Sequence, residues 1–382
     1  MVEIKVKRHE PALIVPENPT KNETLELSDI DDQQGVRVQG AVIMSFKRRS
    51  NSIKGEDDPA KVIKEALAKT LDYYYPFAGR VRETGHHRKL VVDCNGEGVL
   101  FIEADANVTL NDIQTQIIPP CPLLDDLLFD VPGSTGIIDC PLLLFQGGDK
   151  SHEVMNKDES NIIVPGGFLF GPEEIKAIRN HLPSHLQHSY STFELLCACV
   201  WKCRVKALQP DPEDTVQVSM TVSVRENNII LLPSGYYGNS FVSPAITTKA
   251  KNLMMSENSL LYALKLVKQS RNRANEEYVR SMMDLMVMEG RPKYKDHLSW
   301  MATNLTRKGL EFVDFGWGKP VYSGVPRGTS LVSTFTRFKN GKGQDVIAVV
   351  LCLPNEVLLR FQNELGKFVG DFSPLISPTS KL

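Results

Sequence analysis

The sequence contains no long apolar run. A helix that crosses a membrane needs about 20 consecutive and mostly apolar residues, and no stretch of the 382 residues approaches this length. Residues 1–16 also lack the apolar core of a secretory signal. We therefore expect a soluble, intracellular protein with no membrane partner.

The sequence has almost no excess of charge of either sign. Its 44 Lys and Arg residues and 46 Asp and Glu residues give a formal net charge of -2. Proteins that bind nucleic acids or anionic membranes usually carry a positive excess. Nucleic acid is therefore not expected as a partner, although a local basic patch could still bind an anionic ligand.

Cysteine is present but does not occur in closely spaced pairs. The seven cysteines are scattered and form no Cys-x-x-Cys motif, so the sequence predicts neither a disulfide framework nor a metal site. Cys197, Cys199 and Cys203 fall within a predicted helix, where the three side chains cannot all point toward one ion. We expect reduced, buried thiols at these positions.

The chain is too long for one ordinary hydrophobic core. Residues 147–160 are polar and have no helix or strand pattern, so they divide the chain. We expect a truncated N-terminal domain over 1–146, a crossover or linker over 147–170 and a C-terminal domain over 171–382. Helical and strand patterns mix in both halves without strict alternation, which predicts an α/β protein with mixed sheets.

Several segments predict a definite secondary structure. Residues 60–74 and 191–207 predict helices, because apolar residues recur there at helical spacing, and Ser191 has the pattern of an N-terminal cap. The continuous apolar residues within 139–146 predict a strand that is buried on both faces. Residues 312–315 predict a further short strand.

Five short motifs occur in the order that one known family shows. They are Tyr-Tyr-Pro-Phe-Ala-Gly-Arg at 74–80, Cys-Asn-Gly-Glu-Gly-Val at 94–99, Ser-Thr-Phe-Glu at 191–194 with Trp201 and Lys202, Gly-Tyr-Tyr-Gly-Asn at 235–239, and Asp-Phe-Gly-Trp-Gly at 314–318. The last motif is specific, and the others gain weight as an ordered set. On these residues the chain resembles the plant acyl-CoA-dependent alcohol O-acyltransferases, the BAHD family, over nearly its whole length. Leu-Ser-Asp-Ile-Asp-Asp-Gln at 27–33 and Pro-Ser-Gly-Tyr-Tyr-Gly-Asn at 233–239 resemble its benzyl alcohol O-benzoyltransferase-like branch.

The resemblance implies both a fold and an activity. The fold would consist of two chloramphenicol-acetyltransferase-like α/β domains with a channel between them. The activity would be transfer of an acyl group, with benzoyl favoured, from a CoA thioester to an alcohol such as benzyl alcohol. Acyl-CoA would be a co-substrate, no further cofactor would be needed, and acyl-CoA and a small alcohol would be the ligands of a monomer.

The residue on which this chemistry depends is missing from the sequence. Acyl transfer to an alcohol needs a base that takes the hydroxyl proton, and in the family this base is the histidine of a His-x-x-x-Asp motif. None of the eight histidines here has Asp four positions later. In the family the strand that resembles 142–146 leads toward the motif, whereas here Gln146 leads directly into the polar stretch. We therefore expect a first domain that is incomplete by a segment close in size to a small domain.

No other histidine is an obvious substitute for this base. His152 and Asp158 lie six residues apart within the polar stretch, which is the wrong spacing. A base must be held within hydrogen-bond reach of the alcohol, and a flexible linker does not ensure that. The favoured interpretation of this pair is a solvated polar loop.

Because the motif histidine is missing, the one catalytic candidate that the resemblance still implies is Asp314, which stands in the Asp-Phe-Gly-Trp-Gly motif. The alternative is a structural role for the whole motif. Gly316 and Gly318 suit a tight backbone bend, and Trp317 suits a packing anchor.

Three residues are candidates for the lining of the substrate and CoA channel, namely Gly238, Asn239 and Trp317. A turn with positive φ would explain Gly238 and Asn239 equally well. Arg225 stands where the family has the arginine that pairs with the motif aspartate. Without that aspartate Arg225 lacks its expected ion pair, which is costly if the side chain is buried.

The chain ends in Ser380, Lys381 and Leu382, the peroxisomal address that an import receptor reads at an exposed C-terminus. Pro374 and Pro378 precede the tripeptide and favour an extended tail. The sequence therefore predicts import into peroxisomes, where β-oxidation supplies acyl-CoA esters, with the cytoplasm as the alternative.

Three hypotheses about function remain open at this point. The first is an acyl-CoA:alcohol O-acyltransferase, which is the role that the resemblance implies. The second is a catalytically inactive paralogue that binds acyl-CoA or regulates a partner. The third is a truncated product that folds poorly, because removal of a central strand leaves an exposed sheet edge and an unfilled core.

Overall fold

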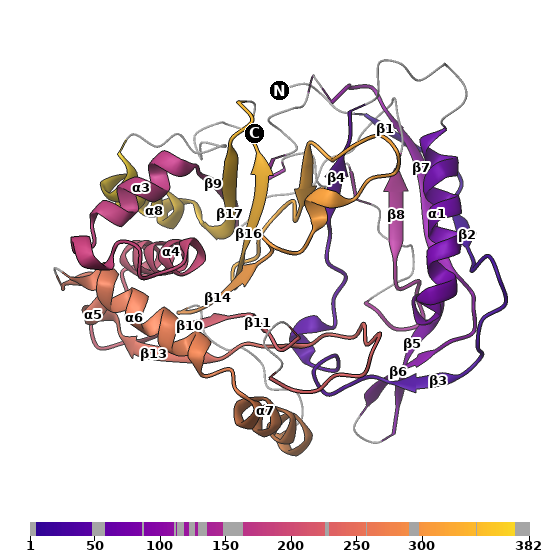
Figure 1. Cartoon of the computed structure of the whole chain (residues 1–382), viewed down its shortest axis with the longest axis horizontal. Coiled ribbons are helices and arrows are strands. Elements are labelled where there is room, and N and C mark those ends of the chain that lie inside the picture. The colour runs from indigo at the N-terminus through magenta and orange to yellow at the C-terminus, as the bar shows by residue number, and fades with distance from the viewer. Residues whose placement is uncertain are drawn as a thin grey trace.

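The computed structural model describes residues 5–47, 58–85, 88–110, 112, 118–121, 127–128, 136–147, 163–225, 229–256, 258–289, 298–340 and 342–370. Helices and strands are mixed throughout, and they gather into an N-terminal half and a C-terminal half (Figure 1). The predicted α/β class with mixed sheets is therefore confirmed.

The N-terminal half contains short strands and one long helix. Its elements are β1 (Val6–Arg8), β2 (Ala12–Ile14), β3 (Thr24–Glu26), the 3-10 helix η1 (Gln34–Val36), β4 (Ile43–Ser45), α1 (Pro59–Tyr73), η2 (Tyr75–Ala78), β5 (Arg80–Thr84), β6 (Lys89–Asp93), β7 (Val99–Ala106) and β8 (Leu144–Gly147). Helix α1 is the helix predicted over 60–74. Asp58 caps its first turn, because the carboxylate accepts a hydrogen bond of 3.0 Å from the backbone N–H of Ala60.

Two small sheets build this half. Strands β1 and β2 pair antiparallel with successive parts of β7, and β8 pairs parallel with β7. Strands β3, β6 and β5 form a second, antiparallel sheet. Helix α1 packs on β2 of the first sheet.

The prediction of a doubly buried strand over 139–146 is wrong in two respects. Only Leu144–Gly147 forms a strand, because Asp139 adopts a positive φ of 56° and interrupts the extended backbone. All four residues of β8 are half-buried, since among the described residues β8 has a strand partner, β7, on one edge alone. The apolar residues before Gly147 therefore lie at a sheet edge.

The C-terminal half holds the larger sheet and the remaining helices. Its elements are β9 (Ile163–Phe170), α3 (Pro172–Asn180), η3 (Ser184–Leu186), α4 (Thr192–Leu208), β10 (Thr215–Met220), β11 (Val222–Ser223), β12 (Phe241–Val242), β13 (Ala245–Lys249), α5 (Ala250–Met254), α6 (Ser259–Asn272), α7 (Glu276–Glu289), β14 (Ser299–Asn304), η4 (Leu310–Phe312), β15 (Tyr322–Gly324), β16 (Val332–Lys339), β17 (Asp345–Pro354) and α8 (Asn355–Val369). Six of these strands form one sheet in the order β13-β10-β14-β16-β17-β9. Helices α3, α4 and α8 lie together on one side of it (Figure 1).

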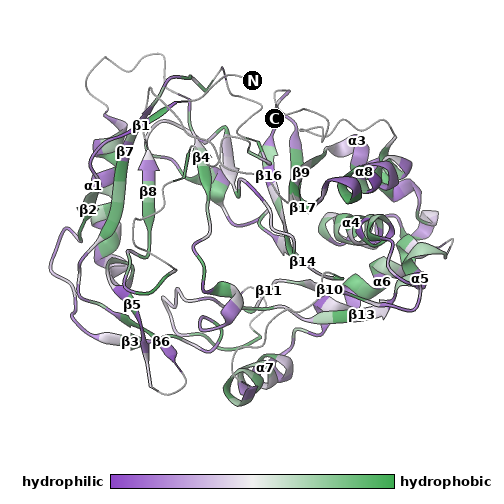
Figure 2. Cartoon of the chain, turned by 180° about the vertical axis from the view of Figure 1, so that it is seen from behind, coloured by the Kyte–Doolittle hydropathy of each residue, from purple (hydrophilic) through white to green (hydrophobic). Residues whose placement is uncertain are grey.

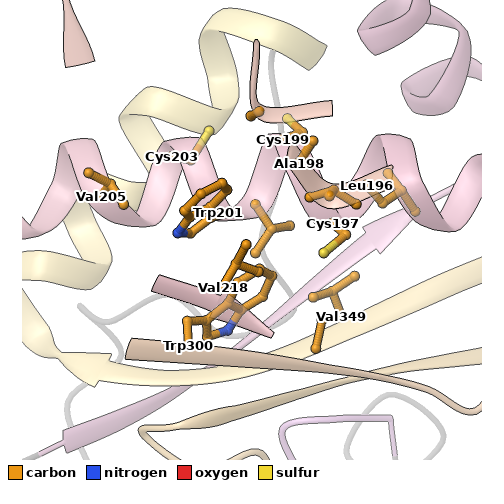
Figure 3. Packing of buried hydrophobic residues seen from close by; sticks show 14 of the residues in the cluster. Leu196, Cys197, Ala198, Cys199, Trp201, Cys203, Val205, Val218, Trp300 and Val349 are labelled. Carbon is orange, nitrogen blue, oxygen red and sulfur yellow. The ribbon is translucent and has the colours of Figure 1, made fainter. Parts of the chain in front are cut away.

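The main hydrophobic core lies between this sheet and α4. Trp201 on α4 and Trp300 on β14 are both fully buried, and Figure 3 shows Trp201 and Cys197 directed toward the sheet while Cys199 and Cys203 point away from it. All seven cysteines are buried and free, which confirms the prediction of buried thiols for Cys197, Cys199 and Cys203. Figure 2 shows hydrophilic and hydrophobic residues alternating along α8, which buries Leu358, Phe361 and Leu365 toward this core.

The structure also changes the expected roles of two segments. Residues 163–170, placed within the crossover, form β9, which pairs along its whole length with β17. Residues 312–315, predicted as a strand, include the end of η4 and a turn instead, because the turn chemistry of the following residues overrides the local strand pattern. Strand β15 pairs antiparallel with β4 of the N-terminal half, so this pair joins the two halves.

Candidate functional site

A cavity of about 1300 Å³ lies where the two halves meet. The N-terminal half contributes residues 33–36 of the η1 segment. The C-terminal half contributes the start of α4, the β10–β11 segment, residues 237–243, the inner face of α7, and parts of β14 and β16. A cavity of this size can hold a large ligand.

The lining carries several cationic side chains. The cationic side chains on the cavity are Arg225, Arg271, Arg307, Lys308 and Arg337. Among the described residues of the lining there is no Asp or Glu. The chain as a whole is nearly neutral, so net charge does not reveal these five side chains, which favour an anionic ligand.

Another part of the lining is apolar and rich in methionine. Helix α7 presents Met282, Leu285 and Met286, and the β10 and β14 strands add Met220 and Met301. Methionine is flexible and polarisable, so it adapts to aromatic or aliphatic groups of different shape. The cavity therefore combines a cationic part with an adaptable apolar part.

The first turn of α4 forms a fixed piece of the wall. Ser191 caps the helix, because its hydroxyl accepts a hydrogen bond of 3.2 Å from the N–H of Glu194, whose carboxylate accepts one of 2.8 Å from the N–H of Ser191. The buried Glu194 also pairs with Arg271 at 3.3 Å. The predicted cap is confirmed, and it orients both Thr192 and Arg271 on the cavity.

Arg225 lies on the cavity and its side chain is exposed rather than buried. Its guanidinium donates hydrogen bonds to the backbone carbonyls of Tyr236 and Gly238, the latter at 2.6 Å, and lies 5.4 Å from the centre of the Tyr236 ring. The penalty that would attend a buried, unpaired arginine therefore does not arise. Arg225 instead supports the loop that carries two predicted channel residues.

Gly238 and Asn239 both line the cavity, as does the adjacent Tyr237. The Tyr237 ring packs edge-on against Tyr74 with 5.8 Å between centroids. Burial, with smaller contributions from Cys94 and Glu23, raises the pKa of Tyr237 above its ordinary value. Tyr237 is therefore a neutral phenol at physiological pH, which can donate a hydrogen bond but is not a strong base.

A residue suited to take a proton from an alcohol is not found among the described residues of the lining. These residues include no His, Asp, Glu or Cys. Among the described histidines, His9 contacts Asp105 at 2.9 Å and His181 packs on Phe368. Neither these two nor His185 and His188 line the cavity. His152 and Asp158 lie outside the described residues.

Asp314, Gly316, Trp317 and Gly318 do not line this cavity. Gly316 and Gly318 adopt φ values of 95° and 92°, which the bend requires and which favour glycine. The Trp317 ring packs edge-on against Phe46, with 5.6 Å between centroids, and beside Phe315. The structure thus brings Arg225, Gly238 and Asn239 together at the cavity and places the Asp-Phe-Gly-Trp-Gly motif at a separate turn.

Sequence reasoning missed most of the charged lining. Arg271 lies on α6, Arg307 and Lys308 follow β14, and Arg337 lies on β16. No motif links these residues, and the one local signal is the adjacent pair Arg307-Lys308. Within the described ranges, no group of three or more His, Cys, Asp and Glu side chains could hold a metal ion. None of the described helices combines the length and apolar character needed to cross a membrane.

The amino-acid sequence is similar to known proteins along most of its length. The pattern that defines the transferase family matches residues 3–147 and 157–367, and so breaks just after β8. Alcohol acyltransferase 1 of Actinidia deliciosa is 42% identical over 433 aligned positions, which cover 96% of this chain and 94% of that protein. Benzyl alcohol O-benzoyltransferase of Petunia hybrida is 40% identical, with 96% and 94% covered. Because 433 positions exceed the 382 residues of this chain by 51, at least that many aligned positions have no counterpart here.

Two solved structures share the fold. Vinorine synthase superposes with a TM-score of 0.68 at 18% identity, covering 96% of this chain and 98% of that one. The F. sporotrichioides protein TRI101, solved with coenzyme A and T-2, gives a TM-score of 0.67 at 16% identity, covering 93% and 100%. The two-domain α/β architecture is therefore the one that the motifs imply. The family pattern and the two relatives show that this chain belongs to the transferase family, the BAHD acyl-CoA-dependent acyltransferases.

Proposed function

We propose that the cavity binds an acyl-CoA thioester, and that this chain binds the thioester without transferring its acyl group at a rate typical of the family. One observation carries the proposal. The described lining has five cationic side chains and a methionine-rich apolar part, but no His, Asp, Glu or Cys. Such a lining can bind phosphate groups together with an acyl group, whereas proton removal from an alcohol needs a base.

The acyl group that we propose is benzoyl, and the alcohol is benzyl alcohol or one like it. The motifs at 27–33 and 233–239 support this choice, and so does the name of the Petunia hybrida relative. Several other relatives are named alcohol acyltransferases. The role of a chain that carries the complete first domain would be transfer of benzoyl from CoA to the alcohol oxygen, with release of free CoA.

The binding part of the proposal is tested by calorimetric titration with benzoyl-CoA and with CoA. A double variant, R307Q/K308Q, removes two cationic side chains from the cavity, and its affinity for both ligands should fall by about tenfold or more. Arg280→Gln is the matched control, since Arg280 is on α7 but pairs with Glu276 outside the lining. A wild-type chain that binds neither ligand would reject the proposal.

The catalytic part is tested by measuring free CoA released from benzoyl-CoA and benzyl alcohol. We expect no release above background from this chain. Insertion after Gly147 of the His-x-x-x-Asp segment of a relative should produce release. If the unmodified chain releases CoA at a rate typical of enzymes, the proposal of an inactive chain is wrong, and loss of that activity in His152→Ala would identify the replacing base.

A second candidate role is that of a truncated product without a function of its own, and the edge of β8 favours it. The four residues of β8 are half-buried, and β7 is the one strand partner of β8 among the described residues. Exposed edges promote aggregation. Thermal unfolding and gel filtration distinguish the two, since a cooperative transition and a monomeric elution volume would count against this role.

We also propose that the chain is imported into peroxisomes through Ser380, Lys381 and Leu382. The tripeptide is the support for this proposal. A fluorescent protein fused to the N-terminus should accumulate in peroxisomes, and deletion of Leu382 should leave it in the cytoplasm. Cytoplasmic fluorescence from both fusions would exclude import by this route.

A further inference from the structure

The loop over residues 235–239 is held from the N-terminal half by one carboxylate. The backbone N–H of Asn239 donates a hydrogen bond of 2.8 Å to Oδ1 of Asp31, a residue 208 positions earlier in the sequence. The Tyr236 hydroxyl lies 3.4 Å from the other oxygen, Oδ2. The Asp31 side chain therefore links the two halves at a loop that forms part of the cavity wall, in addition to the ring contacts of Tyr237 with Tyr74 and Phe77.

The Asp31 side chain is also held in place by hydrogen bonds within its own turn. The Ser28 hydroxyl donates a hydrogen bond of 2.7 Å to Oδ2 of Asp31, and the N–H of Asp31 donates one of 3.2 Å to the Ser28 oxygen. The carboxylate is thus oriented by its own turn and presents Oδ1 to the loop. Such an arrangement orders the acceptor in advance and reduces the entropy lost when the loop docks.

The backbone of the loop approaches this carboxylate so closely that a Cβ at position 238 would require the Asp31 or Tyr236 side chain to shift. A Cβ at Gly238 would lie 2.7 Å from Oδ2 of Asp31 and 2.6 Å from the Tyr236 hydroxyl oxygen. The glycine is therefore explained by its proximity to Asp31, and a positive φ is not needed to account for it.

The opposite side of the loop is held by Arg225, which donates to the carbonyls of Tyr236 and Gly238. Asp31 and Arg225 thus bind backbone groups of the same four-residue segment, 236–239. Tyr237, Gly238 and Asn239 line the cavity between these contacts, whereas Asp31 does not line it. Asp31 can therefore act on a bound ligand through the loop alone.

We infer that Asp31 is a positioning residue, which holds residues 237–239 in the conformation that forms this wall of the acyl-CoA site. The inference rests on the proposed function for the identity of the ligand, but not for the position of the loop. The inference assigns a role to the Leu-Ser-Asp-Ile-Asp-Asp-Gln segment. Asp31 binds the loop of the C-terminal half, while the neighbouring Asp32 binds Arg37 at 2.6 Å within the N-terminal half.

Three variants test the inference. Asp31→Ala removes both acceptors, whereas Asp31→Asn retains an oxygen for the N–H of Asn239 and an amide that can donate to the two hydroxyls. Asp29→Ala is the matched control, because Asp29 lies on the same segment but pairs with Lys89 at 3.2 Å, within the N-terminal half. Thermal unfolding of each variant shows whether the chain is folded.

The first measurement is amide hydrogen exchange in the ligand-free chain. Exchange at Asn239 and its neighbours should rise in Asp31→Ala and stay near the wild-type level in Asp31→Asn and Asp29→Ala. Equal exchange in Asp31→Ala and Asp29→Ala would overturn the inference, whatever the chain binds.

The second measurement is calorimetric titration with benzoyl-CoA. Its Kd should rise about tenfold in Asp31→Ala and be largely restored in Asp31→Asn. If the wild-type chain binds no benzoyl-CoA, the proposed function fails while the exchange result still decides the role of Asp31. Faster exchange in Asp31→Ala with an unchanged Kd would overturn the part of the inference that concerns the ligand.

Discussion

The carboxylate of Asp314 accepts a hydrogen bond of 2.8 Å from the backbone N–H of Gly318, and the same Oδ1 accepts another of 2.8 Å from the N–H of Gly316. Both donors belong to residues with positive φ. The side chain thus closes the turn of its own motif. Trp317, which the turn presents, packs on Phe46 of the N-terminal half.

Replacement of Asp314 tests whether the main role of this residue is to stabilise the turn. Asp314→Ala should lower the free energy of unfolding by about 0.5–1.5 kcal/mol, because two backbone N–H groups lose their acceptor at an exposed turn where water can replace it. Asp314→Asn keeps an acceptor oxygen and should lose less. Urea unfolding measures the change, and benzoyl-CoA binding should be unaffected. An Asp314→Ala chain of normal stability that no longer binds benzoyl-CoA would place Asp314 in the site.

Replacement of Gly238 tests the close approach of the loop. Gly238→Ala introduces a Cβ that overlaps with Asp31 and the Tyr236 hydroxyl, and we expect a stability loss of about 1–3 kcal/mol together with weaker benzoyl-CoA binding. Gly40→Ala is the control, since a Cβ there meets no atom within 4 Å. Tyr236→Phe, added to Gly238→Ala, removes one overlap and should recover part of the loss. If the stability losses of Gly238→Ala and Tyr236→Phe simply add in the double variant, the close contact between position 238 and the Tyr236 hydroxyl is contradicted.

The reactivity of the thiols tests whether the chain is well packed. Burial raises the pKa of Cys94 and of Cys352 to about 11, and only thiolates react rapidly with disulfide reagents. At pH 8 the native chain should show no rapidly reacting thiol, and the chain unfolded in guanidinium should show all seven. Several fast thiols in the native chain would favour the poorly folded product.

The pH dependence of stability tests the hydrogen bond from Tyr75 to Glu23. The Tyr75 hydroxyl donates to Oε1 of Glu23 at 2.5 Å, and this bond raises the pKa of Tyr75 from 10.0 to about 12. The folded chain therefore holds this proton more tightly than the unfolded chain, so the stabilisation is complete below about pH 10 and is lost as the pH rises toward 12. The difference in unfolding free energy between wild type and Tyr75→Phe should shrink over this range. A difference that is constant from pH 9 to 12 would refute the assignment.

The elements that the sequence predicted well are those with strong local signals. Helix α1 begins at Pro59 after an aspartate cap, and α4 begins at Thr192 after the Ser191 cap, with Glu194 in its first turn. In both, the cap and the helical repeat agree. The strand predicted over 139–146 failed because burial depends on which strands lie alongside, and that information is not local.

Local motifs also indicated a part of the candidate site, whereas residues that only the fold brings together were not predicted. Gly238 and Asn239 stand in a recognisable motif, and they line the cavity. Arg271, Arg307 and Arg337 come from separate elements, and only the fold brings them onto one cavity. The link between Asp31 and Asn239 was equally hidden, because no pattern in a single sequence pairs residues so far apart.

The junction between β8 and β9 has a consequence for how this scaffold can be altered. Strand β8 ends at Gly147 on β7, and β9 begins at Ile163 on β17, so each flank is anchored by its own sheet. The cost of closing a loop rises slowly with its length. Segments of different length inserted at this junction should therefore change the free energy of unfolding of the two flanking sheets only slightly.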